Sequence, residues 1–186
     1  MMAYRCLRVF AGFVLVMLTG CLGADPTTPA PGSPVELRLA PGDKLRVIVY
    51  GEDKVSGDFQ IDNAGYISLP LAGTIKGAGL TKSEMERDIT IALKSQYLRN
   101  PKVTVDVVSY RPFYVLGEVK TPGEYPFRSG LNVLSAIAIA GGATYRANNS
   151  KVTIQRFGEA EATEVPQSTS VLVMPGDVVR VPERFF

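Results

Sequence analysis

Short runs of alternating apolar and polar residues recur along this chain from about residue 39. The first three runs occupy positions 45–50, 59–61 and 66–69. Turn residues precede or separate them: Pro41, Gly42, Asp43 and Gly65. Alternation with a period of two is typical of half-buried strands, and Pro and Gly at these positions reverse the chain. The stretch 39–80 is therefore predicted to be a compact sheet unit with tight turns.

The spacing of apolar residues changes to four between positions 81 and 97. One face of a helix with this spacing would carry four of them: Met85, Ile89, Leu93 and Tyr97. Thr81 and Glu84 have the separation of a capping box, which predicts that the helix begins at Thr81. Asn100-Pro101 ends the pattern. Alternating valines from Val103 to Val107 then predict a strand with one solvated face.

A second set of elements begins near Tyr110. The segments 113–119 and 121–125 together predict a strand, a turn and a second strand. A short apolar helix is predicted at 131–140 and another strand at 152–156. Turn glycines are predicted at three positions: Gly123, Gly141 and Gly142. Pro175, Gly176 and Asp177 repeat the opening turn and begin a strand that runs to Val181. The whole pattern predicts an α+β protein of two small β-rich modules, each with one helix.

The first twenty residues have the features of a lipoprotein signal peptide. Two arginines precede an apolar core at 9–18, which is shorter than the roughly 20 residues that a membrane-spanning helix needs. Leu18-Thr19-Gly20-Cys21 then resembles a lipobox, so Cys21 is the predicted site of lipid attachment. Two alternatives are an ordinary signal peptide with an incidental cysteine and an uncleaved signal anchor. Bacterial lipoproteins with Asp after the cysteine tend to stay in the inner membrane, so the resemblance to them, with Leu22 at that position, implies delivery to the outer membrane.

Residues 21–35 are predicted to be a tether between the lipidated cysteine and the folded part. Four prolines favour extended backbone over helix or strand in this stretch: Pro26, Pro29, Pro31 and Pro34. Acyl chains on Cys21 would hold the mature chain at the membrane. The predicted organisation is therefore a signal peptide (1–20), a lipidated tether (21–35) and modules at 36–109 and 110–186.

Composition and charge exclude several classes of function. The chain has 20 Lys and Arg, 18 Asp and Glu, and no histidine. Removal of Arg5 and Arg8 with the signal would leave the mature chain near neutral, without a basic stripe for nucleic acid. Ser-His and Cys-His catalysis and histidine-bearing metal sites are excluded outright. We therefore expect no enzyme activity, no metal and no cofactor.

Several carboxylates are candidates for chemistry but are better explained as turn residues. Asp43 and Asp177 each follow Pro-Gly, where an aspartate commonly bonds nearby backbone. Asp58 and Asp62 could form a carboxylate pair of the kind that glycosidases use, although Asp62 precedes a turn sequence. A calcium site at 52–58 lacks the loop spacing that oxygen ligands require.

The chain resembles the bacterial polysaccharide export proteins, the outer-membrane (Wza-like) export lipoproteins. Five segments in order carry the resemblance: the Pro-Gly-Asp opening, DNAGYISLPLAGTI, GLTKSE, VLGEVKTPGEY, and the Ala-Gly-Gly after the second helix. The resemblance implies an export domain at 36–109 and a β-grasp-like SLBB domain at 110–186. It also implies a periplasm-facing, outer-membrane lipoprotein that forms an oligomeric ring, conducts exopolysaccharide or capsule chains, and works with an inner-membrane polysaccharide co-polymerase.

Larger members of this family carry a C-terminal amphipathic helix that forms the outer-membrane pore. This sequence stops directly after the strand that follows Pro175-Gly176-Asp177, so we expect a separate outer-membrane β-barrel to provide the crossing. The alternative function is a non-conducting lipoprotein that binds envelope glycan or another envelope protein.

Overall fold

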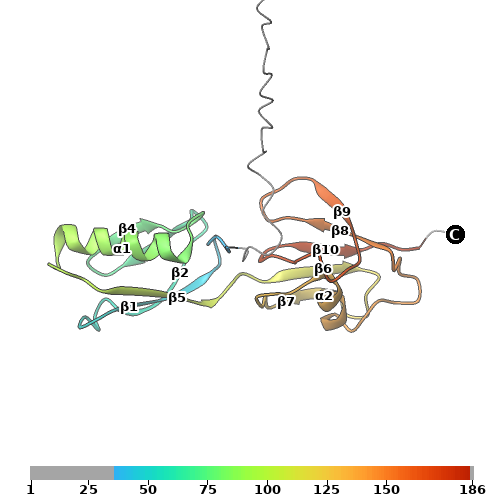
Figure 1. The fold of residues 1–186 in the computed structure, drawn as a ribbon, viewed down its shortest axis with the longest axis horizontal. Helices are drawn as coiled ribbons and strands as arrows, with labels where there is room; N and C mark the ends of the chain where they lie inside the picture. The colour runs from blue at the N-terminus through green and yellow to red at the C-terminus, as the bar shows by residue number, and fades with distance from the viewer. Residues whose placement is uncertain (1–35, 185–186) are drawn as a thin grey trace, which may run out of the picture. The chain divides into compact units, whose positions relative to one another are not determined.

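The computed structural model describes residues 36–184 (Figure 1). The predicted signal peptide, Cys21 and the proline-rich tether lie outside the described residues. The first half of the described chain forms six elements: β1 (Lys44–Val49), β2 (Gly57–Gln60), β3 (Tyr66–Leu69), β4 (Gly73–Lys76), α1 (Lys82–Gln96) and β5 (Val103–Ser109). The second half also forms six: β6 (Phe113–Gly117), β7 (Gly123–Tyr125), α2 (Val133–Ile139), β8 (Lys151–Gln155), β9 (Ala162–Pro166) and β10 (Val178–Val181).

The first module is built on a three-stranded antiparallel sheet in the order β2-β1-β5. Every second residue of β1 is fully buried, as the alternation predicted: Leu45, Val47 and Val49. β3 does not join this sheet, because it pairs with β4 in a separate two-stranded hairpin. β4 was not predicted, since Gly73-Thr74-Ile75-Lys76 contains a single large apolar residue.

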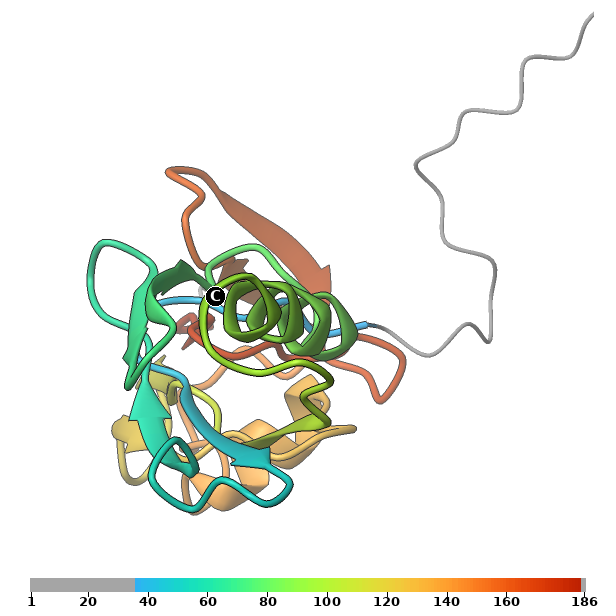
Figure 2. The same ribbon diagram turned by 90° about the vertical axis from the view of Figure 1, so that its left-hand side faces the viewer.

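Helix α1 covers one face of this sheet, as Figure 2 shows in a view nearly along the helix axis. The predicted capping box is confirmed. The Thr81 hydroxyl accepts from the Glu84 N–H at 3.2 Å, and Glu84 Oε2 accepts from the Thr81 N–H at 2.8 Å. Met85, Ile89 and Leu93 are fully buried in the core.

Tyr97 does not belong to the buried face of α1, so that part of the prediction is wrong. The helix ends at Gln96, and Tyr97 is its C-cap with a non-helical φ of −135°. The side chain is 55% exposed. The four-residue spacing therefore holds only as long as the backbone remains helical.

The second module is a five-stranded sheet in the order β7-β6-β10-β8-β9. β10 lies in the centre, parallel to β6 and antiparallel to β8. Helix α2 lies along one side of the sheet (Figure 1) and begins at its N-cap Asn132, whose side chain accepts from the Ser135 N–H at 2.9 Å. The core contains residues from the helix and from one face of the sheet: Phe113, Val115, Val133, Ala136, Ile137, Val152, Ile154, Val179 and Val181.

Three details of this module differ from the prediction. The strand predicted at 113–119 ends at Gly117, and Val119 makes only an isolated bridge to Ala143. Gly123 is not a turn residue with positive φ, because it begins β7 opposite Val115. β9 was missed because four of its five residues are exposed and the apolar alternation is weak.

Each module has its own hydrophobic core, one centred on α1 and the other on α2. The predicted α+β fold of two small β-rich modules, each with one helix, is thus confirmed. Boundaries at 36–109 and 110–186 stay predictions.

Candidate functional site

The first Pro-Gly-Asp turn is organised by the carboxylate of Asp43, which is fully buried. Asp43 Oδ2 accepts from the Ala40 N–H at 2.8 Å, and the Asp43 N–H donates to the Ala40 carbonyl at 3.1 Å. Gly42 between them has φ +95°, a conformation that side chains disfavour. The turn therefore holds a buried negative charge at the start of β1.

Arg111 supplies the positive charge that pairs with Asp43. Its backbone N–H donates to Asp43 Oδ1 at 2.8 Å, and its Nη1 lies 3.1 Å from Asp43 Oδ2. Arg111 follows β5 by two residues and precedes β6 by two, so this contact holds the segment between the modules against the first turn. The guanidinium also lies over the ring of Phe157, 4.4 Å from its centroid.

The second Pro-Gly-Asp turn repeats this design. Asp177 Oδ2 accepts from the Met174 N–H at 2.7 Å and from Arg156 Nη1 at 2.5 Å. The Gly176 N–H donates to the Pro112 carbonyl at 2.9 Å. The two turns, which are more than 130 positions apart in the sequence, thus contact neighbouring residues, Arg111 and Pro112.

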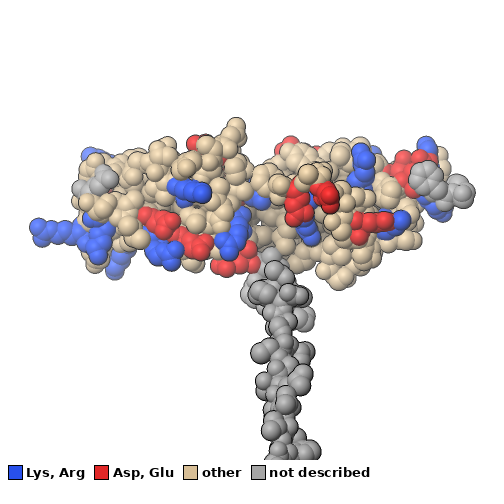
Figure 3. Space-filling model, turned by 90° about the horizontal axis from the view of Figure 1, so that it is seen from above, with Lys and Arg blue, Asp and Glu red and all other residues tan. Residues whose placement is uncertain are grey.

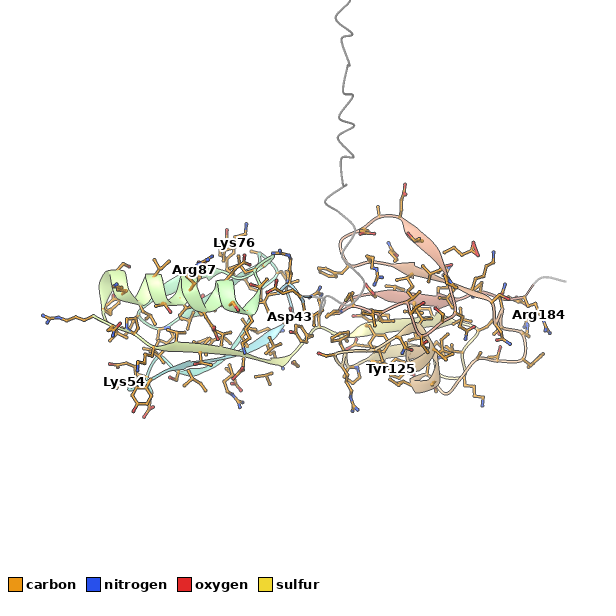
Figure 4. All side chains as sticks on the ribbon, in the orientation of Figure 1. Asp43, Lys54, Lys76, Arg87, Tyr125 and Arg184 are labelled. Carbon is orange, nitrogen blue, oxygen red and sulfur yellow. The ribbon has the colours of Figure 1, made fainter. Side chains whose placement is uncertain are left out.

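The carboxylate of Asp177 has fewer of its hydrogen-bond acceptors satisfied than that of Asp43. Its Oδ1 is buried without a hydrogen-bond partner among residues 36–184. Burial raises the pKa of Asp177, against the opposite effects of Arg156 and of the N–H groups of Met174 and Phe157. The Phe157 N–H lies near the carboxylate but does not reach Oδ1 with hydrogen-bond geometry. For comparison, the side chain of Asp43 is labelled in Figure 4.

The other candidate carboxylates do not form a pair. Asp58 binds Arg46 across β1 and β2 at 2.6 and 2.9 Å, and this hydrogen bond lowers the pKa of Asp58. Asp62 accepts from the N–H groups of Ala64 and Tyr66 within its own turn, as the sequence predicted. No group of His, Cys, Asp or Glu in the described part of the chain is arranged to hold a metal ion.

The sheet faces opposite the helices carry shallow hollows that sequence analysis did not find. On the second sheet, a hollow of about 250 Å³ lies over β6, β8, β9 and β10, lined by Leu116, Thr153, Gln155, Ala162, Val178 and Arg180. A similar hollow on the first sheet is lined by Ile48, Tyr50, Lys102 and Thr104. Each hollow combines apolar side chains with a cation and a hydroxyl group.

On the side drawn in Figure 3, basic and acidic side chains are interspersed and do not form a large patch of one charge. Among residues 36–184, no helix has both the length and the apolar character needed to cross a bilayer.

These features define a tandem of two small sheet-and-helix domains with two Pro-Gly-Asp turns whose aspartates are buried. Residues 31–108 match the family described as polysaccharide biosynthesis/export protein. Residues 112–166 match the SLBB domain. The chain belongs to the polysaccharide biosynthesis/export family, as its resemblance predicted.

The chain is similar to several named proteins of polysaccharide export. It is 33% identical over 181 residues to the exopolysaccharide production protein ExoF of Rhizobium meliloti (strain 1021), covering 89% of this chain and 42% of ExoF. It is 35% identical over 145 residues to the EPS I polysaccharide export outer membrane protein EpsA of Ralstonia solanacearum, covering 72% and 38%. The polysialic acid transport protein KpsD of Escherichia coli is 33% identical over 106 residues, covering 56% and 19%. The chain thus spans less than half the length of each of these relatives.

Proposed function

We propose that this protein is an outer-membrane-anchored, periplasm-facing component of an exopolysaccharide or capsule export machine. In this proposal it forms an oligomeric ring through which the polymer passes, and it works with an inner-membrane polysaccharide co-polymerase. It is not an enzyme, and it requires no cofactor. The similarity to ExoF, which extends across both modules and 89% of this chain, is the observation that carries the proposal.

The geometry of the site supports an assembly or conduit role over catalysis. The two most buried carboxylates, Asp43 and Asp177, are each occupied by an arginine and by turn N–H groups. Asp43 accepts from the Arg111 N–H, and the turn of Asp177 binds the Pro112 carbonyl through the Gly176 N–H, so both turns hold the backbone at residues 111 and 112. The hollows lie on exposed sheet faces, where a passing polymer or a neighbouring subunit could reach them.

A genetic test in the encoding bacterium addresses the export role directly. Deletion of the gene is expected to abolish surface polysaccharide, and the full-length chain is expected to restore it. Copurification of a detergent-extracted oligomer with an inner-membrane co-polymerase would support the ring. A monomer that instead captures peptidoglycan, with surface polysaccharide unchanged by the deletion, would contradict the export role and favour a non-conducting glycan-binding lipoprotein.

Lipid attachment at Cys21 is tested by mass and fractionation. Cys21→Ser is expected to abolish acylation and release the chain from outer-membrane fractions, because the acyl chains supply the anchor. Cys6→Ser is the matched control, since that residue belongs to the predicted signal peptide and should not alter the mature mass. A wild-type chain without the added mass of acyl groups would contradict this part of the proposal.

A further inference from the structure

The hollow on the second sheet is lined by an arginine, Arg180, that has no ion-pair partner among residues 36–184. Arg180 lies on β10, opposite Leu116 of β6 and Thr153 of β8. Its side chain is exposed, and within residues 36–184 it makes no hydrogen bond or ion pair. The nearest acidic residue in the same cross-strand row, Glu164 on β9, is paired with Lys151. Arg180 therefore presents an unpaired guanidinium to the hollow.

The rest of the hollow offers two other kinds of contact. Gln155 has a fixed amide, because its Nε2 donates to the Glu159 carbonyl at 3.0 Å, and Thr153 contributes a hydroxyl group. Leu116, Val178 and Ala162 provide apolar surface beside them. A guanidinium matches a carboxylate in a bidentate geometry, while hydroxyl and amide groups match sugar hydroxyls.

The size and depth of the hollow indicate what class of ligand it fits. At about 250 Å³ it is smaller than the roughly 300–1,000 Å³ of pockets that enclose a drug-sized molecule. It lies open on the sheet surface, so a ligand held there could continue beyond it in both directions. These properties suit one unit of a long chain better than a whole small molecule.

We propose that the Arg180 hollow makes a transient contact with carboxylate-bearing sugar units of the exported polymer. This inference rests on the proposed export function and names the class of polymer, an acidic polysaccharide. Arg180 binds the carboxylate, Thr153 and Gln155 bind ring hydroxyls, and the apolar residues contact the C–H face of the sugar. A conduit needs contacts that are strong enough to admit the chain and weak enough to release it. A single solvent-exposed arginine meets that requirement.

The proposal is tested by binding of defined oligosaccharides to the full acylated chain in detergent. Oligomers of galacturonic acid are the acidic probe, and maltooligosaccharides of equal length are the neutral comparator. Wild type is expected to bind the acidic probe weakly, with affinity that falls as salt is added. Arg180→Gln is expected to reduce that binding about tenfold, and Arg180→Lys to give an intermediate value, because lysine cannot bind a carboxylate bidentately.

Arg99→Gln is the matched control, since Arg99 is an exposed arginine of the first module, outside the hollow. It should leave binding unchanged. Equal losses in the Arg180 and Arg99 variants would mean that general charge, and not the hollow, attracts the probe. Equal binding of acidic and neutral probes, or a change in oligomer size without a change in binding, would also overturn the proposal. None of these outcomes bears on export itself, which the gene deletion tests separately.

Discussion

The two Pro-Gly-Asp turns share a sequence and a hydrogen-bond pattern but differ in how well the buried carboxylate is satisfied. In both turns, one carboxylate oxygen accepts from the N–H three residues earlier, at 2.8 Å in the first and 2.7 Å in the second. Both carboxylate oxygens of Asp43 accept hydrogen bonds, whereas Oδ1 of Asp177 accepts none within the described chain. Their arginines differ too, since the Arg111 side chain is 13% exposed and that of Arg156 is 35% exposed. A repeated local motif thus does not guarantee a repeated energetic role.

The largest expected difference comes from removing each carboxylate. Asp43→Ala should cost about 3–5 kcal/mol of unfolding free energy, because it leaves a buried guanidinium and two N–H groups without an acceptor. Asp177→Ala should cost less, about 1–3 kcal/mol, because Arg156 can reach water and one oxygen was already unsatisfied. Urea unfolding of the purified full chain measures both. Equal losses would show that the two carboxylates contribute alike despite their different partners.

The glycines of the two turns provide the next test. Both have positive φ, so alanine at either should cost about 1–2 kcal/mol from the backbone alone. A Cβ at Gly176 would also lie 2.7 Å from Phe157 Cδ2 and 2.8 Å from Arg111 Nε, whereas at Gly42 the nearest atom is 3.5 Å away. Gly176→Ala should therefore cost about 2–4 kcal/mol in total, once the overlap is included.

Thermal unfolding of the two alanine variants gives this comparison. The extra cost at Gly176 should shrink in a Phe157→Ala background, which removes one of the two overlapping side chains. If the cost at Gly176 is the same in both backgrounds, the backbone conformation and not the crowding sets it.

The smallest expected effect is a difference in pH dependence. Burial raises the pKa of the Asp177 carboxyl in the folded protein. The protonated carboxyl therefore contributes to the free energy of unfolding below its ordinary pKa of about 3.9, and this contribution is lost as pH rises through the folded-state pKa. Asp177→Asn does not titrate, so its free energy of unfolding should lack this pH dependence. The difference in free energy of unfolding, wild type minus variant, should therefore decrease from acidic to neutral pH.

Glu84→Gln is the control with the opposite sign. The Thr81 N–H lowers the pKa of Glu84, so its contribution is present above the ordinary pKa and lost as pH falls. Chemical denaturation at several pH values measures both variants. Parallel pH profiles for the two would contradict the assignment of Asp177 as the poorly matched carboxylate.

Local signals in the sequence predicted most of the fold. The alternation of β1, the capping box of α1 and the helix followed by Gly141-Gly142 each depend on residues close together in the chain, and the structure contains all three elements. β4 and β9 escaped detection because their residues are mostly exposed and their pairing comes from a neighbouring strand. Tyr97 was misplaced because spacing alone does not report where a helix ends.

The site was harder to predict because its partners are distant in sequence. Asp43 and Arg111 are 68 positions apart, and nothing in either local segment indicates that they meet. One feature of the sequence could have indicated these pairs. Arg111 and Arg156 each lie within two residues of the end of a strand, where a charged side chain can reach a neighbouring loop. The Arg180 hollow arises from four strands side by side, so only the sheet order reveals it.

The central place of β10 has a consequence for biogenesis. The last strand of the second module joins β6 and β8, so that sheet cannot close until residues 178–181 have been synthesised. The sheet of the first module is complete at β5 and contains no strand from the second half of the chain, so it can form before the second sheet. Until the final strand arrives, β6 and β8 expose unpaired edges that invite aggregation. These edges stay open until β10, which begins about 60 residues after the end of β6, is free to pair with both strands.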